Sequence, residues 1–167
     1  MMKRVSTFHF QQHKKRDKIM KKGWIQKTGK GTYTGQGFRT VWMKIENGRL
    51  SWSRAPGEIE KNSVDLDGYT LEVKDEYFVI KHPKKRHVEM RVIKSMNNKW
   101  MEEKNDWILH IKRALVYIRI ERAKIFFSKG KRSDDLSGNH LRAFTMYFNG
   151  VAMLMEAIKM GQEIGDS

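Results

Sequence analysis

Apolar and polar residues alternate over the first half of the chain, which is the pattern of short β-strands with one buried face. The clearest run covers residues 38–46, where one face is shared by Arg39, Val41, Met43 and Ile45. Asn47-Gly48 follows directly and is the strongest short-range signal for a β-hairpin turn. Leu50 and Trp52 continue the alternation after the turn, so a second strand is expected to pair with the first.

Further β signals lie at residues 24–27, 64–66, 69–73, 77–80 and 88–92. A loop with glycines at positions 29, 31, 35 and 37 separates the first of these from residues 38–46. Short strands with close turns predict a mainly β fold of seven strands that curls into a barrel or sandwich.

The hydrophobic period then changes to that of a helix. One face of this helix is predicted to hold Trp100, Trp107, Ile111, Ala114 and Ile118. Asn97 or Asn98 can cap its start, and the helix is expected to continue towards Phe127. Residues 130–138 are interpreted as a polar linker.

A second helix is predicted after this linker, with apolar residues spaced alternately by three and four. They are Leu141, Phe144, Phe148, Val151, Met155 and Ile158. So large an apolar face must be covered by something. We expect the helix to fold back on the preceding one, and the alternative is a dimer formed through this helix.

The predicted organisation has three parts. Residues 1–20 form a basic N-terminal arm, residues 21–118 form the β domain with its closing helix, and residues 119–167 form a C-terminal helical extension. The arm is expected to be solvated, and the alternative is a short interfacial helix that uses Phe8 and Phe10.

The net charge of the chain predicts an anionic partner. The chain of 167 residues carries 34 Lys and Arg against 19 Asp and Glu, a formal net charge of +15. Such an excess favours nucleic acid, an acidic membrane leaflet or an acidic protein. There is no cysteine, so disulfides and thiolate metal sites are excluded. The apolar runs are too short to span a bilayer, and a cytoplasmic protein is the expectation.

Enzymatic and cofactor chemistry finds no support in the motifs. The glycine spacing between Gly23 and Gly31 fits neither a P-loop nor a dinucleotide fingerprint. The histidines are scattered without carboxylates at metal-ligand spacing, so no metal or other cofactor is predicted. No serine occupies a nucleophile-elbow setting, and we predict that the chain is not an enzyme.

Basic residues instead gather at the predicted strand ends and loops. The candidate anion-binding residues are Lys27, Lys30, Arg39, Arg54, Lys84, Lys85 and Arg86. Composition alone does not place these side chains together, and a set of unrelated solvated charges remains the alternative.

Several motifs, taken in order, resemble the pleckstrin homology (PH) domain family. They are Lys22-Gly-Trp-Ile-Gln-Lys27, Trp42 in the second strand, Asn47-Gly48-Arg-Leu-Ser-Trp52, Phe78-Val-Ile80 and the helical Trp107. The resemblance covers about residues 21–118. It implies a PH-like seven-stranded β-barrel or sandwich capped by a C-terminal helix, to which this chain adds another helix.

The resemblance also implies that the loops after the first, third and sixth strands surround the open end, which brings the basic residues together. In phosphoinositide-binding members a lysine late in the first strand and two basic residues in the second hold the phosphates. Lys27 and Arg39 match the first two positions. The third position holds Val41, which has no donor for phosphate.

These observations predict a peripheral membrane adaptor in the cytoplasm that binds phosphoinositide or phosphatidic-acid head groups with modest selectivity. Each basic residue near an anionic leaflet contributes about 1 kcal/mol, so several together suffice without a perfect pocket. The alternative is a PH-like protein-interaction module, with a partner or a second copy held through residues 119–167. Nucleic acid is not favoured, because aromatic and basic residues do not interleave on an exposed sheet.

Overall fold

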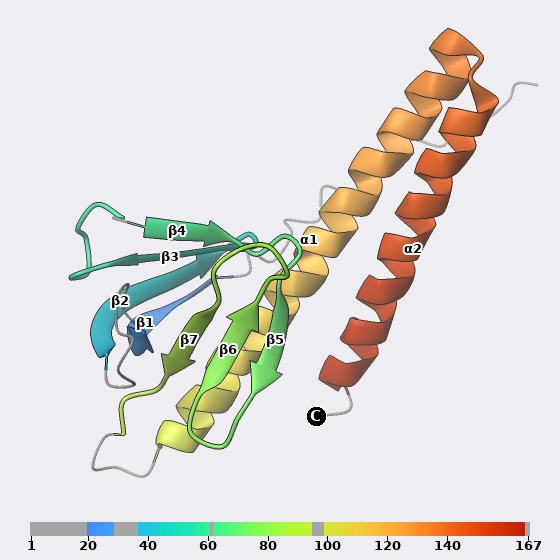
Figure 1. The fold of residues 1–167 in the computed structure, drawn as a ribbon. Helices are drawn as coiled ribbons and strands as arrows, with labels where there is room; N and C mark the ends of the chain where they lie inside the picture. The colour runs from blue at the N-terminus through green and yellow to red at the C-terminus, as the bar shows by residue number, and fades with distance from the viewer. Residues whose placement is uncertain (1–19, 29–36, 61, 95–98, 166–167) are drawn as a thin grey trace, which may run out of the picture.

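The computed structural model describes residues 20–28, 37–60, 62–94 and 99–165 as seven strands followed by two helices (Figure 1). The strands are β1 (Met20–Thr28), β2 (Phe38–Glu46), β3 (Arg49–Ser53), β4 (Asn62–Asp65), β5 (Thr70–Val73), β6 (Phe78–Lys81) and β7 (Val88–Arg91). The helices are α1 (Trp100–Ser137) and α2 (His140–Gly165). The predicted β domain with a closing helix and one added helix is confirmed. The basic arm, the glycine loop and the capping asparagines lie outside the described residues, apart from Met20 and Gly37.

All seven strands belong to one antiparallel sheet with the order β4-β3-β2-β1-β7-β6-β5. The sheet is open, and its two halves run in clearly different directions in Figure 1. β1 belongs to both halves. It pairs with β2 along its whole length, from Met20 to Thr28, and with β7 at Gln26 and Lys27.

Helix α1 closes one end of the sheet through the predicted face. Trp107, Ile111 and Ala114 are fully buried, and Ile118 is 9% exposed. A Cβ atom built on Gly23 of β1 would lie 3.4 Å from Cζ2 of Trp107, an ordinary contact distance, so the indole packs against the strand at this residue. The helix therefore covers the core and fixes the middle of β1.

The predicted hairpin turn between β2 and β3 is confirmed, and it is docked on α1. Asn47 and Gly48 both have positive φ angles, of 48° and 81°, as a two-residue type I′ turn requires. A Cβ atom on Gly48 would lie 2.3 Å from Cγ1 of Ile118. Glycine is needed here both for the turn and for the contact with the helix.

The prediction of a linker at residues 130–138 is wrong. Helix α1 continues without a break through position 118 to Ser137, and it ends at Gly138, whose φ angle is +58°. Tyr147 of α2 packs on Gly130 within this helix, where a Cβ atom would lie 2.8 Å from the ring. A glycine in a helix costs about 1 kcal/mol in isolation, and the interhelical contact offsets this.

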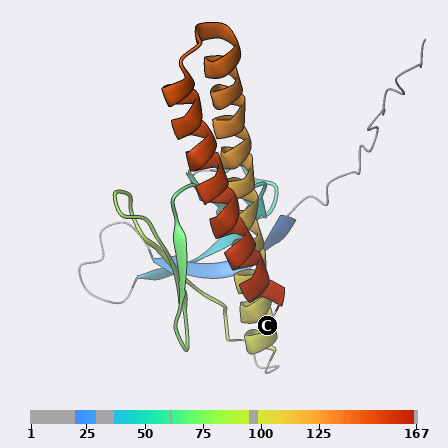
Figure 2. The same cartoon turned by 90° about the vertical axis from the view of Figure 1, so that its right-hand side faces the viewer.

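Helix α2 folds back antiparallel beside α1, as expected, and the far half of the pair extends past the sheet (Figures 1 and 2). The face that makes the contact is not the predicted one. The buried residues of α2 are small and recur every seventh position: Ala143, Gly150 and Ala157. Small residues let two helices approach closely, and Phe127 fills the space over Gly150. The six predicted apolar residues are exposed instead.

The Gly150 contact leads to a prediction about the helix pair. A Cβ atom at this position would lie 2.9 Å from the Phe127 ring, so Gly150→Leu should force the helices apart at a cost of about 2 kcal/mol. Hydrogen exchange should show α2 losing protection while the sheet keeps its own. Gly161→Ala is the matched control, because nothing lies within 4 Å of a Cβ there and helix propensity should stabilise α2 by about 1 kcal/mol. Equal protection in both variants would contradict the proposed tight packing.

Candidate anion-binding site at the open end of the sheet

The centre of the candidate site is Lys27, near the end of β1. Its side chain is on the inward face of the sheet and is only 8% exposed. The ammonium lies 4.6 Å from the centroid of the Trp52 ring, and it donates a hydrogen bond of 2.8 Å to the carbonyl oxygen of Thr28. A cation over an indole ring is partly stabilised, but one carbonyl does not satisfy its three donors.

Two arginines act on this lysine. Arg39 is directly opposite Lys27 in the register of β1 and β2, and Arg86 comes from the loop between β6 and β7. The pKa of Lys27 is lowered first by burial of the ammonium, then by the positive charge of Arg86, and then by that of Arg39. Among the residues that the structure describes, no carboxylate contributes to this shift. Positive charge is therefore concentrated around Lys27.

The loop that supplies Arg86 is held by Tyr69. The Tyr69 hydroxyl donates a hydrogen bond of 3.2 Å to the carbonyl oxygen of Arg86, and the Lys85 ammonium lies 6.0 Å from the Tyr69 ring. His82 packs against the same ring, with 4.9 Å between centroids, and accepts a hydrogen bond from the backbone N–H of Lys84. These contacts give the basic loop a defined backbone.

The predicted site residues are thus placed unequally. Lys27, Arg39 and Arg86 come together, and Lys84 and Lys85 are exposed in the same loop as Arg86. Arg54 is exposed in the bend that follows β3, and Lys30 lies outside the described residues. Val41, at the third position, is half-buried against the core, so it contributes packing.

Sequence analysis missed Trp52 as a site residue. It is half-buried, is opposite Met43 in the register of β2 and β3, and carries the ring on which the Lys27 ammonium rests. The signal was available, because Leu50 and Trp52 share the inward face of β3. An aromatic residue on that face, one strand beyond Arg39, is within reach of a lysine on β1.

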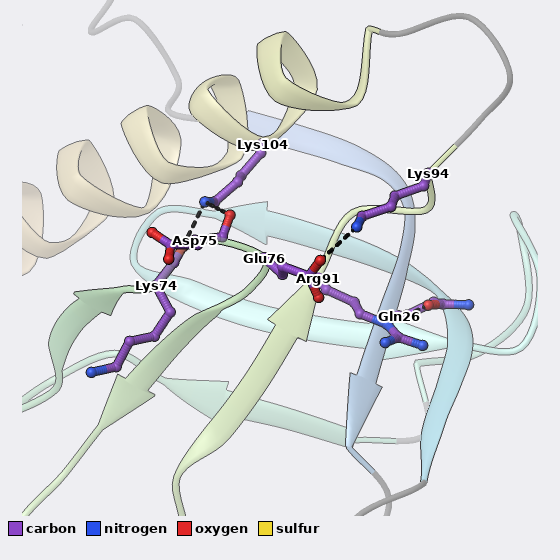
Figure 3. A network of polar contacts seen from close by, with 7 residues as sticks. All are labelled: Gln26, Lys74, Asp75, Glu76, Arg91, Lys94 and Lys104. Carbon is purple, nitrogen blue, oxygen red and sulfur yellow. Dashed lines mark hydrogen bonds and ion pairs between the residues drawn. The ribbon is translucent and has the colours of Figure 1, made fainter.

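A second polar cluster lies on the outer side of β1 and β7 (Figure 3). It borders a hollow of about 300 Å³ lined by Gln26, Glu76, Arg91, Val92, Ile93 and Lys94. Its cations already have partners in the chain. Lys94 pairs with Glu76 at 2.7 Å, and Arg91 donates a hydrogen bond of 2.7 Å to the Gln26 side chain. The side chains of Lys94 and Arg91 are therefore already engaged within the chain.

Lys104 in the same view has a structural role. It is 5% exposed, and its ammonium donates hydrogen bonds of 2.6 Å and 2.7 Å to the carbonyl oxygens of Lys74 and Asp75 (Figure 3). These carbonyls belong to the turn between β5 and β6. The first turns of α1 are thereby tied to the far half of the sheet.

The described residues hold no group of three or more His, Asp or Glu side chains arranged to bind a metal ion. Within this part of the chain, neither helix combines the length and the apolar character that crossing a bilayer requires.

Seven antiparallel strands in this order, closed at one end by a helix with a buried tryptophan, define the PH fold. The chain has this fold, with a second helix packed against the first. No protein-family model and no curated protein sequence matches it.

Several solved structures that are similar to the chain are PH domains. The N-terminal PH domain of human ARAP2 is 27% identical, over 58% of this chain and 79% of that one, with a TM-score of 0.46. The PH domain of human pleckstrin homology domain-containing protein family A member 5 is 16% identical, over 69% and 88%, with a TM-score of 0.47. The C-terminal PH domain of pleckstrin in complex with D-myo-Ins(1,2,3,4,5)P5 is 18% identical, over 56% and 95%, with a TM-score of 0.44.

Proposed function

We propose that this module binds anionic lipid head groups at the Lys27 site and so associates peripherally with membranes. The observation that carries the proposal is the placement of Lys27. This ammonium is removed from water next to Arg39 and Arg86, and both lower its pKa. Concentrated positive charge of this kind is unfavourable until an anion enters. Charge-assisted hydrogen bonds to a phosphate group would then stabilise the ammonium and the guanidinium groups.

Modest selectivity is part of the proposal. Val41 adds no donor, so phosphate contacts would come from Lys27, Arg39 and the loop around Arg86. The exposed side chains of Lys84 and Lys85 would add attraction to a charged leaflet of about 1 kcal/mol each. Phosphoinositide and phosphatidic acid share the phosphate chemistry that such a site recognises.

Vesicle sedimentation tests the site. Wild type should sediment with vesicles that contain phosphatidic acid or phosphoinositide. With neutral vesicles it should stay in the supernatant. Replacing both Lys27→Met and Arg39→Gln should weaken binding about 30-fold, since two basic residues contribute about 2 kcal/mol. The matched control is Lys131→Met with Arg132→Gln, which removes the same charges from an exposed part of α1.

The two pairs of substitutions separate a site from general attraction. Equal losses in the site and control variants would refute the head-group site and leave net charge as the cause. A neutral-lipid preference would refute the proposal altogether.

Binding should also depend on pH through Lys27. Its pKa is lowered in the free protein, and a bound phosphate raises it again by favouring the ammonium. Binding therefore takes up a proton between these two pKa values, and affinity should fall as the pH rises through that interval. Sedimentation from pH 7 to alkaline pH should show this fall in wild type. The Lys27→Arg variant should not show this pH dependence, because a guanidinium keeps its proton. If the pH dependence persists in this variant, Lys27 is not its source.

Protein binding is a second candidate function. The observation in its favour is the row of exposed apolar side chains on α2. Such surfaces commonly mark interaction sites.

A further inference from the structure

The exposed face of α2 forms one continuous row, here called the α2 stripe. It consists of Leu141, Phe144, Phe148, Val151, Met155 and Ile158, which are 47% to 79% exposed. Two of its rings are already stacked on each other, Phe144 and Phe148, with centroids 6.5 Å apart. The stripe is therefore a preformed apolar surface that α1 leaves uncovered.

The spacing of the α2 stripe indicates what fits it. Its members follow at intervals of three, four, three, four and three residues, which is the a and d pattern of a coiled-coil seam. A repeat of 3.5 residues presents a straight row to a neighbouring helix, whose side chains insert between its members. The partner is accordingly expected to be another helix.

The area of the stripe is that of an interface. Given the exposed fractions, the six side chains present on the order of 700 Å² of apolar surface, above the roughly 300–600 Å² of the largest patch on a typical monomer. Stable protein interfaces bury about 800 Å² per partner. Covering the whole α2 stripe with a matching helix would therefore bury nearly the area that a stable interface buries on each partner.

Charge distinguishes a protein partner from a membrane. The described length of α2 holds two basic residues, Arg142 and Lys159, and two acidic ones, Glu156 and Glu163. A helix that lies on an anionic membrane carries an excess of Lys and Arg beside its apolar face. In a chain with a net charge of +15, these charges cancel along α2, so two copies can meet there without local repulsion.

We propose that the α2 stripe is a self-association surface, which pairs with the same stripe of a second copy of this chain across a two-fold axis. Both copies then bury their Phe144 and Phe148 rings. The interface is formed by the same surface of each copy, as two-fold symmetry requires. This inference goes beyond head-group binding and does not depend on it.

Sedimentation equilibrium of the full chain tests the proposal. Wild type should approach twice 19.8 kDa as its concentration rises. Phe148→Glu with Met155→Glu should remain a monomer and lose at least 100-fold in dimer affinity, with an unchanged circular dichroism spectrum because both side chains are exposed. Arg142→Glu, an exposed change on another side of α2, is the control and should still dimerise.

Salt separates this association from anion binding. Higher ionic strength screens the repulsion between two positive copies, so the dimer should strengthen while vesicle binding weakens. A wild type that stays monomeric at 100 µM or more, or a doubly substituted variant that still dimerises, would overturn the proposal. If wild type is a monomer and the variant with Phe148→Glu and Met155→Glu loses vesicle binding, the stripe is a membrane contact and the proposal is overturned.

The absence of cysteine from the chain offers a direct check. Phe148→Cys introduces a single thiol at the middle of the stripe, and oxidation should link two copies through it. Arg142→Cys should give no such link. Equal cross-linking of the two variants would show random collisions and would contradict a defined pair of stripes.

Discussion

Trp107→Ala is expected to destabilise this protein more than any other single change considered, by about 3–5 kcal/mol. The indole is fully buried and fills the space between α1 and β1, against Gly23. Because domains of this size are stable by only about 5–15 kcal/mol, the variant should be partly unfolded at 37 °C.

Thermal and urea unfolding followed by circular dichroism would measure this loss. Trp24→Ala is the control, since Trp24 is 40% exposed on the outer face of the sheet and contacts Trp42 edge to face. Its cost should be about 1 kcal/mol. Trp107→Phe should cost clearly less than alanine, because the indole N–H has no hydrogen-bond partner among the described residues and its removal leaves nothing unpaired. Similar losses for Trp24→Ala and Trp107→Ala would contradict the role given to the helix.

Lys104→Met is expected to produce the second-largest effect, a loss of about 3 kcal/mol. Methionine can fill the apolar part of the site, but the carbonyl oxygens of Lys74 and Asp75 would lose a charged donor while half enclosed. Hydrogen bonds to charged groups contribute about 1.5–3 kcal/mol each, and this variant loses two of them. The turn between β5 and β6 should also lose hydrogen-exchange protection before the rest of the sheet.

Lys94→Met provides the comparison in the same region. Lys94 makes an exposed ion pair with Glu76, and such pairs contribute little to stability because water screens them. Unfolding curves for the two variants should therefore separate clearly. If Lys104→Met is as stable as Lys94→Met, the two hydrogen bonds do not hold the turn.

Much of the fold follows from the sequence because its strongest patterns are local. Alternation along residues 38–46, the Asn47-Gly48 turn and the helical spacing of Trp107 and Ile118 each depend on neighbours close in the chain. The continuation of α1 through Gly130 could not be predicted in this way. Gly130 reads locally as a break, and its contact with Tyr147 of the other helix is not visible in the local pattern.

The packing face of α2 shows a different limit. Periodicity gives weight to large apolar residues, so it identified the α2 stripe as the face to be covered. The face that packs is made by Gly150 and two alanines, whose value is the close approach they allow and not their hydrophobicity. The stripe was correctly recognised as apolar, but the wrong neighbour was assigned to it.

The candidate site was predictable in part for a similar reason. Lys27 and Arg39 are on neighbouring strands, so strand pairing alone places them opposite each other. Arg86 could not be distinguished from Lys84 and Lys85, because the loop conformation is set by the hydroxyl and ring of Tyr69. The contact of Trp52 with Lys27 joins β3 to β1 across the intervening β2, and alternation along a single strand does not predict such a contact.

The length of α1 has a consequence for any assembly built on this chain. With 38 residues and a rise of about 1.5 Å per residue, it is a rod of about 57 Å that begins beside the sheet and ends beyond it. In a pair joined through α2, this rigid helix would hold the two head-group sites at a fixed separation. A membrane carrying lipids at that separation would be held with the avidity of two contacts, whereas a single soluble head group would gain nothing.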